Sequence, residues 1–124
     1  MSHTIIYNPE THAVNIEVQG DVTFDYIKEM LKQTVLVVKE NNARCLLHDY
    51  RKAQWKLSTS EIYELPRIAL DAYASIGINA RTLERVAVVA KNFEDARFLE
   101  TVFVNTGQRV KVTRDIDEAM KWVC

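Results

Sequence analysis

The chain has 124 residues, with sixteen Lys and Arg against seventeen Asp and Glu and a formal net charge of −1. It shows no basic stripe of the kind that nucleic-acid-binding proteins carry, and no apolar run approaches the ~18 residues of a membrane span. The start, MSHTIIYNPE, lacks the parts of a signal peptide, and two cysteines, Cys45 and Cys124, make no disulfide framework. We therefore expect one soluble, cytoplasmic domain over residues 1–124 that binds neither nucleic acid nor membrane.

The apolar pattern predicts alternating strands and helices. Strands are predicted at residues 3–7, 13–18, 44–49, 85–90 and 109–113. Helices are predicted at about 23–40, 59–76, 93–106 and 115–123. The short turn between the first two strands implies an antiparallel hairpin, and the later alternation implies parallel strands. The predicted fold class is α/β, a five-stranded mixed sheet with four helices in the order β-β-α-β-α-β-α-β-α.

Cap and breaker residues mark the ends of these elements. Gly20 to Thr23 should break the second strand and cap the first helix, and Pro66 should kink or break the second helix near Leu65. Four further signals are a left-handed cap at Gly77, a stop at Gly107, and caps at Asn92 and Asp115.

The polar second faces of strands two and five predict that helices cover mainly one side of the sheet. Leu46, Ala87 and Val89 would then face outward on the other side. Two explanations stay open: self-association into a homodimer, or a helix that covers this face.

The segment from Cys45 to Pro66 is the predicted functional region. An apolar strand ends at Asp49, a polar loop with aromatic and basic residues follows, and Ser58 with Glu61 forms a capping box that opens the next helix. In parallel sheets, ligands usually bind at the carboxyl ends of central strands. The predicted surface comprises Asp49, Tyr50, Arg51, Trp55, Ser58 and Ser60.

The element order, the segment Leu46 to Asp49 and the ending from Gly107 to Trp122 resemble the STAS superfamily, in particular small SpoIIAA-like bacterial proteins. The resemblance implies a regulatory domain that binds a kinase-like protein partner and is switched by phosphorylation after the third strand. Those antagonists carry an Asp-Ser-Ser-Gly type of turn there. Here Asp49 is followed by Tyr50, and hydroxyls come only at 58–60, so only the location of the surface carries over.

Ser58 or Ser60 as a phosphosite suits a helix amino end, but a plain helix cap explains the same serines and is the interpretation we favour. Asp49 could also be a phosphoacceptor of the response-regulator receiver type. The sequence lacks the acidic pair and the other residues that such a site needs, so the simpler role of the Asp49 carboxylate is to accept backbone amides in its own turn.

The mixture of Tyr50, Arg51, Lys52, Trp55 and Lys56 suits an acidic or phosphate-bearing partner. The alternative that we prefer has Trp55 packed inward and the cations solvated. Cys45 and His48, three apart on a strand, point to opposite faces and cannot chelate one metal ion. No cofactor motif or catalytic constellation is recognisable.

The sequence thus predicts a non-enzymatic regulatory or protein-interaction domain without cofactor or metal. The alternative is a carrier of a small or lipid-like molecule in the crevice after strand three. A deep apolar pocket that opens near Tyr50 and Trp55 favours the carrier, and a flat or convex surface there favours the protein partner.

Overall fold

The computed structural model describes residues 2–91 and 93–123, without the side chains of 93–95. Five strands form one sheet in the order β1-β2-β3-β4-β5. β1 pairs antiparallel with β2, and the other neighbours are parallel. The strands are β1 (Ser2–Asn8), β2 (Ala13–Thr23), β3 (Cys45–Lys56), β4 (Arg85–Ala90) and β5 (Val110–Thr113). The predicted mixed α/β fold is confirmed, and β3 lies at the centre of the sheet.

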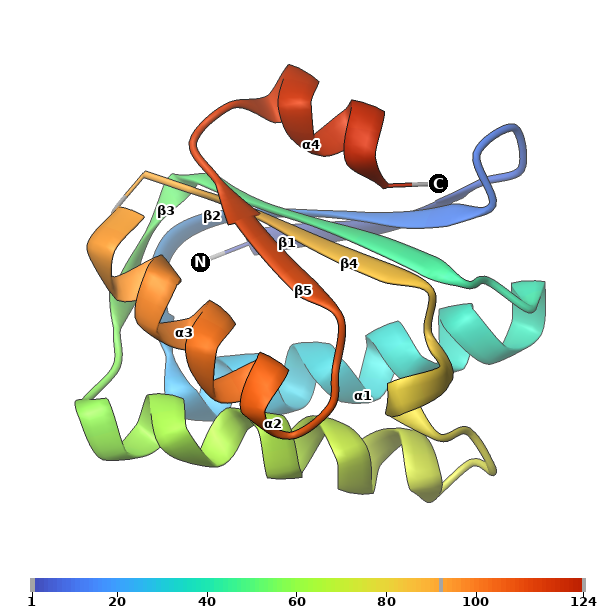
Figure 1. Cartoon of the computed structure of the whole chain (residues 1–124), viewed down its shortest axis with the longest axis horizontal. Helices are drawn as coiled ribbons and strands as arrows, with labels where there is room; N and C mark the ends of the chain where they lie inside the picture. Colours follow the sequence, from blue (N-terminus) through green and yellow to red (C-terminus); the bar gives the residue numbers. More distant parts are fainter. Residues whose placement is uncertain (1, 92, 124) are drawn as a thin grey trace.

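Four helices cover the two faces of the sheet unequally. Figure 1 shows α1, α2 and α3 together on one face and α4 alone on the other. The helices are α1 (Phe24–Asn41), α2 (Thr59–Ala74), α3 (Phe93–Asn105) and α4 (Ile116–Trp122), with a short 3₁₀ turn at Ala80–Thr82. Within residues 2–91 and 93–123, no helix combines the length and apolar character needed to cross a membrane.

The start of α1 follows its predicted cap but not the predicted strand break. The Thr23 side chain accepts a hydrogen bond from the Tyr26 amide, as an N-cap does. The break at Gly20 is wrong, because β2 continues through it to Thr23 while pairing with the last residues of β3.

Helix α2 is continuous from Thr59 to Ala74, so of the predicted kink or break near Leu65 the break is wrong. Pro66 lacks the amide proton that would bond inside the helix, but its side chain is less than 2 % exposed. Its carbonyl accepts a hydrogen bond from Gln108 Nε2 at 3.1 Å. Packing and this tertiary bond therefore hold the proline within the helix.

The glycine signals after two helices are confirmed. Gly77 and Gly107 have φ values of +84° and +85°, the left-handed region that glycine enters without a Cβ penalty. At Gly107 a Cβ would also lie 3.3 Å from the Arg81 side chain. The predicted Asp115 cap of α4 is confirmed as well, whereas Asn92 lies outside the described residues.

Helix α4 answers the question that the sequence left open, because it covers the outer face of the sheet. That face forms a separate apolar cluster of Ala13, Cys45, Leu47, Ala87, Val89, Ala119 and Val123. Ala87 and Val89 face this side as predicted, but Leu46 belongs to the main core under α1 to α3. The covering helix therefore removes the argument for self-association through this face.

Cys45 is fully buried in this outer cluster and is disulfide-bonded. This corrects the expectation that the cysteines make no disulfide framework. Cys124 lies outside the described residues.

Candidate functional site

The site begins with the unexpected length of β3. The sequence predicted a polar loop after Asp49, but β3 continues to Lys56, and α2 begins at Thr59. The strand persists because Lys52 to Lys56 pair in parallel with Gln19 to Thr23, the part of β2 that the predicted break removed. The predicted loop is therefore wrong, and its side chains alternate across a sheet.

A β-bulge interrupts this alternation. Glu17 of β2 pairs with Asp49 and Gln19 pairs with Lys52, so Val18 alone lies opposite two residues of β3. A bulge of this kind leaves one residue outside the ladder and re-aims the side chains that follow. The Asp49 carboxylate stabilises it by accepting the Arg51 backbone amide at 3.0 Å.

The bulge brings two aromatic side chains to the same face of the sheet. Before it, even-numbered residues such as His48 and Tyr50 face α1 to α3; after it, the odd-numbered Ala53 and Trp55 do so. In a regular strand, Tyr50 and Trp55 would point to opposite faces. The inward packing of Trp55 that we favoured from the sequence is thus confirmed.

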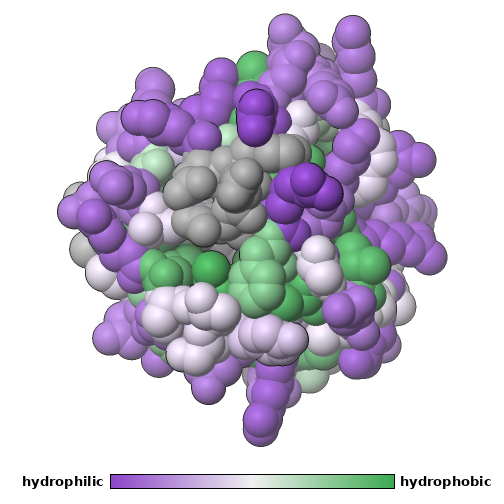
Figure 2. Space-filling view, turned by 60° about the vertical axis from the view of Figure 1, so that its left-hand side comes forward, coloured by the Kyte–Doolittle hydropathy of each residue, from purple (hydrophilic) through white to green (hydrophobic). Residues whose placement is uncertain are grey.

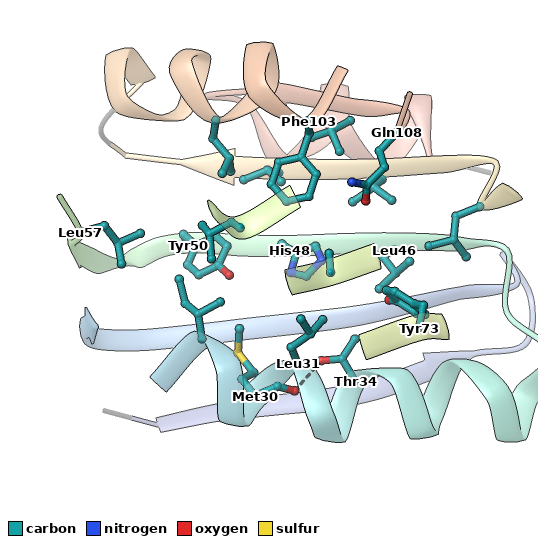
Figure 3. Close-up of a pocket in the computed structure, with 18 of the residues that line it drawn as sticks. Met30, Leu31, Thr34, Leu46, His48, Tyr50, Leu57, Tyr73, Phe103 and Gln108 are labelled. Atoms are coloured by element: carbon teal, nitrogen blue, oxygen red, sulfur yellow. Dashed lines mark hydrogen bonds between the residues drawn. The ribbon is translucent and has the colours of Figure 1, made fainter. Parts of the chain in front are cut away.

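An apolar cavity of about 100 Å³ lies between the sheet and helices α1 to α3. Figure 3 shows His48 in the middle of its sheet wall, with Tyr50 to one side and Leu46 to the other. Helix α1 contributes Met30, Leu31 and Thr34 from below, and Phe103 closes the opposite side. The wall is almost entirely hydrocarbon and aromatic surface.

Three rings line up along the β3 wall. The His48 and Tyr50 rings are stacked at 6.1 Å between centroids, with an interplanar angle of 1°. Trp55 meets Tyr50 edge to face at 5.3 Å and 87°. Such contacts add about 0.5–1.5 kcal/mol to the burial of each pair and hold the rings in position.

Two polar atoms on this wall have no partner. His48 Nδ1 and Trp55 Nε1 are buried and make no hydrogen bond with any residue that the structure describes. Burial lowers the pKa of His48 to about 4 from its usual 6.5, so the imidazole is neutral at pH 7. By contrast, Thr34 Oγ1 donates to the Met30 carbonyl at 2.9 Å. Buried polar atoms without a partner are uncommon in folded proteins, so these two call for an explanation.

A second, polar depression lies beyond the aromatic wall. It is an open groove of about 590 Å³ lined by Tyr50 and Trp55, which also line the cavity, and by Asp21, Lys52 and Lys91. Figure 2 views the molecule from a side on which an apolar patch is bordered by hydrophilic side chains. Tyr50 and Trp55 thus separate an apolar cavity from a charged groove.

The six predicted site residues do not share one surface. Tyr50 is buried and Trp55 half-buried on the cavity side, while Ser58 and Ser60 are exposed at the start of α2. Asp49 and Arg51 point to the opposite face.

Asp49 and Arg51 form a two-pronged ion pair, with N–O distances of 2.8 and 2.9 Å. Burial raises the pKa of the Asp49 carboxyl, but the hydrogen bonds and charge of Arg51 outweigh burial and lower it overall. The Arg51 guanidinium is therefore engaged within its own strand, and the local role that we favoured for Asp49 is confirmed.

The capping box at the start of α2 is confirmed. Ser58 Oγ accepts from the Glu61 amide at 3.2 Å, and Glu61 Oε1 accepts from the Ser58 amide at 2.8 Å. We expect Ser58→Ala to lower the free energy of unfolding by about 1 kcal/mol. Ser60→Ala removes only an exposed contact with Ser58 and should change it by less than about 0.5 kcal/mol. Urea denaturation checks both, and equal effects would contradict a capping role.

His48 is the site residue that was missing from the surface predicted from the sequence. The two do lie on opposite faces, as predicted. The available signal was an imidazole placed between Leu46 and Tyr50 on one face of a central strand. Among the residues of known placement, no group of three or more His, Cys, Asp or Glu is arranged to hold a metal ion.

Comparison with known proteins defines the class of fold. No protein-family model and no curated protein matches this sequence. Solved structures do match over nearly the whole chain, and they show that this is a SpoIIAA-like fold.

One similar structure is an uncharacterised protein of the DUF3478 family, with a SpoIIAA-like fold, from Shewanella loihica PV-4. It has a TM-score of 0.63 and 15 % identity, with 99 % of this chain and 93 % of that chain covered. The Bacillus cell fate determinant SpoIIAA in its phosphorylated form has a TM-score of 0.56 and 9 % identity, with 99 % and 100 % covered. The unphosphorylated anti-sigma factor antagonist SpoIIAA has a TM-score of 0.55 and 12 % identity, with 98 % and 97 % covered.

Proposed function

We propose that this SpoIIAA-like domain is a non-enzymatic binding protein for a small, mainly apolar ligand, which it holds in the cavity between the sheet and α1 to α3. The observation that carries the proposal is the cavity itself, an apolar space with two unpartnered polar atoms on one wall. Apolar pockets with a few convergent polar groups are the usual form of small-molecule sites. Tyr50 and Trp55, the residues named in the carrier alternative, line this pocket.

Filling the cavity tests this function. Ala69 lines the cavity from α2 and is 8 % exposed. Leucine at this position adds three carbons, so we expect Ala69→Leu to weaken binding of an apolar probe such as benzene at least about tenfold, because a close-packed interior has no second space for it. Chemical shifts in ¹⁵N-labelled protein, followed during titration, measure the binding.

Ala74→Leu is the matched control, since Ala74 is exposed near the end of the same helix. It should leave binding unchanged. Binding that survives in Ala69→Leu, with the fold retained, would show that the probe sits elsewhere.

A second candidate function is docking of a protein partner, the function that the resemblance favoured. SpoIIAA is named as an anti-sigma factor antagonist, and the likeness to it supports a regulatory role by fold analogy. The specific support in this chain is the exposed rim of Lys52, Gln54 and Lys56, which follows the bulge at the carboxyl end of a central strand. A partner that matches this rim carries an acidic patch.

Charge reversal tests the docking function. We expect Lys52→Glu with Lys56→Glu to lower the affinity for a copurifying partner at least about tenfold, since like charges then face each other. Lys121→Glu reverses the charge of an exposed lysine on a different element, α4. Quantitative mass spectrometry of copurified proteins compares the variants, and equal recovery from all of them would contradict docking at the rim.

Three further expectations from the sequence stay predictions: a homodimer, a bacterial source and a cytoplasmic location. The homodimer no longer has the outer face of the sheet as its argument, because α4 covers that face. Analytical ultracentrifugation decides the oligomeric state.

A further inference from the structure

The chemistry of the cavity wall restricts the ligand further. None of the described residues that line it is Lys, Arg, Asp or Glu. Its titratable groups are His48, Tyr50 and Tyr73. Burial lowers the pKa of the first and raises the pKa of both tyrosines, so all three are uncharged near neutral pH. The wall therefore offers no countercharge to an ion.

An ionised group in such a space would lose its hydration without gaining a partner, which costs far more than the burial of a neutral polar group. A neutral oxygen has a partner available. Trp55 Nε1 is a hydrogen-bond donor only, so it requires an acceptor. His48 Nδ1 donates or accepts according to its tautomer, and a hydroxyl satisfies either form.

The volume sets the size of the apolar body. A dry cavity of about 150 Å³ in another protein holds one benzene molecule. The cavity here is about 100 Å³, smaller than that one, so a single six-membered ring is the upper limit of size and requires a small movement of the wall.

We propose, on the basis of the function proposed above, that the cavity selects an uncharged ligand: a compact apolar body of ring size with one neutral hydroxyl, carbonyl or amide oxygen set against Trp55 Nε1 or His48 Nδ1. The polar end lies on the β3 wall, where Tyr50 packs between the two rings. The apolar end faces the hydrocarbon of α1 and α3, such as Leu31 and Phe103.

The rival ligand is an acid whose carboxylate lies outside the cavity. Lys52 and Lys91 line the polar groove, and the groove shares Tyr50 and Trp55 with the cavity. Such a ligand would extend past Tyr50 and Trp55, which lie in edge-to-face contact. The uncharged lining of the cavity favours the uncharged ligand, and the acid becomes an outcome of the test.

Four probes of one ring each distinguish these cases: benzene, phenol, benzamide and benzoate. Benzamide and benzoate have the same shape and differ in charge. We expect benzamide to bind at least about tenfold more tightly than benzoate at pH 7, because only benzoate places an unpaired charge in the cavity. We expect phenol to bind about three- to tenfold more tightly than benzene, the range of one neutral hydrogen bond. Chemical-shift titrations of ¹⁵N-labelled protein give the dissociation constants.

Two variants locate the polar end. Trp55→Phe and His48→Phe keep an aromatic ring and remove one polar nitrogen each. We expect at least one of them to abolish the advantage of phenol over benzene. Tyr63→Phe, at an exposed position of α2, should keep it. The comparison of the four probes on the unaltered protein stands even if a variant fails to fold.

The outcomes separate this inference from the proposed function. Benzoate that binds as tightly as benzamide, or phenol that gains nothing over benzene, overturns the uncharged, oxygen-bearing ligand while ring binding still supports the cavity as a site. If none of the four probes shifts cavity resonances at about 10 mM, a concentration that would reveal even millimolar affinity, the proposed function itself fails.

Discussion

Replacement of Ile16 by alanine should lower the free energy of unfolding by about 3 kcal/mol, within the range measured for large-to-small changes in packed cores. Ile16 lies in β2, fully buried, and pairs with His48 of the central strand. The sheet lies on one side of it and α1 to α3 on the other, so the surrounding atoms have little freedom to close the space that alanine leaves. The lost stability therefore combines the transfer free energy of the removed carbons with the cost of the cavity that they leave.

The neighbouring strand supplies the control. Ile6 of β1 carries the same side chain but is 62 % exposed, so Ile6→Ala should change the stability by less than about 0.5 kcal/mol. Urea denaturation of both variants measures the difference. Equal losses would show that strand propensity, rather than burial, determines the cost at these positions.

Acidification should destabilise the protein through His48 well before it affects the carboxylates. Its pKa is about 4 in the folded chain and 6.5 in the unfolded chain. Between these values the unfolded state binds one more proton than the folded state, so stability falls as the pH falls. A shift of this size corresponds to about 2–3 kcal/mol, allowing for the part of the ring that faces the cavity. The loss begins near pH 6.5 and is complete near pH 4.

The variant His48→Gln isolates this effect, because glutamine does not titrate. Denaturation curves at a series of pH values should lose most of their slope between pH 6.5 and 4 in the variant. The lowered pKa of Asp49 acts in a different range, since its contribution is lost only as the pH falls below the unfolded value of 3.8. An unchanged slope in His48→Gln would mean that the imidazole is solvated in the folded protein.

The elements that the sequence predicted well are those with strong local signals. The alternation in β2, the continuous apolar run of β4 and the Ser58–Glu61 capping box each specify their structure within a few residues. The order of strands and helices could be predicted from these signals, and the parallel pairing of β2 to β5 could be predicted from that order.

The errors come from contacts made at a distance along the chain. Gly20 and the polar residues after Asp49 favour a turn locally, but the two segments pair with each other and extend both strands. Pro66 favours a break, yet its carbonyl accepts from Gln108, forty-two positions further along the chain. Propensity describes one segment, and pairing across the sheet can override it.

The sequence placed the candidate site on β3, whose residues line the cavity, but it did not predict which way their side chains point. The bulge moves Trp55 to the face of Tyr50 and leaves Arg51 with Asp49 on the other face. The periodicity of one strand does not reveal a bulge, because the extra residue is recognised only when the strand is paired with its neighbour. For the same reason His48 was not recognised as part of a cavity.

The bulge also affects how this chain should be aligned with its relatives. Upstream of residue 51 the inward positions of β3 are even-numbered, and downstream they are odd-numbered. A homologue without the extra residue would match this chain correctly on only one side of that point under an ungapped alignment. Sequence comparisons should therefore permit a single-residue gap there. Without the gap, solvent-facing lysines are aligned with interior aromatic residues, and the alignment score of a true homologue falls.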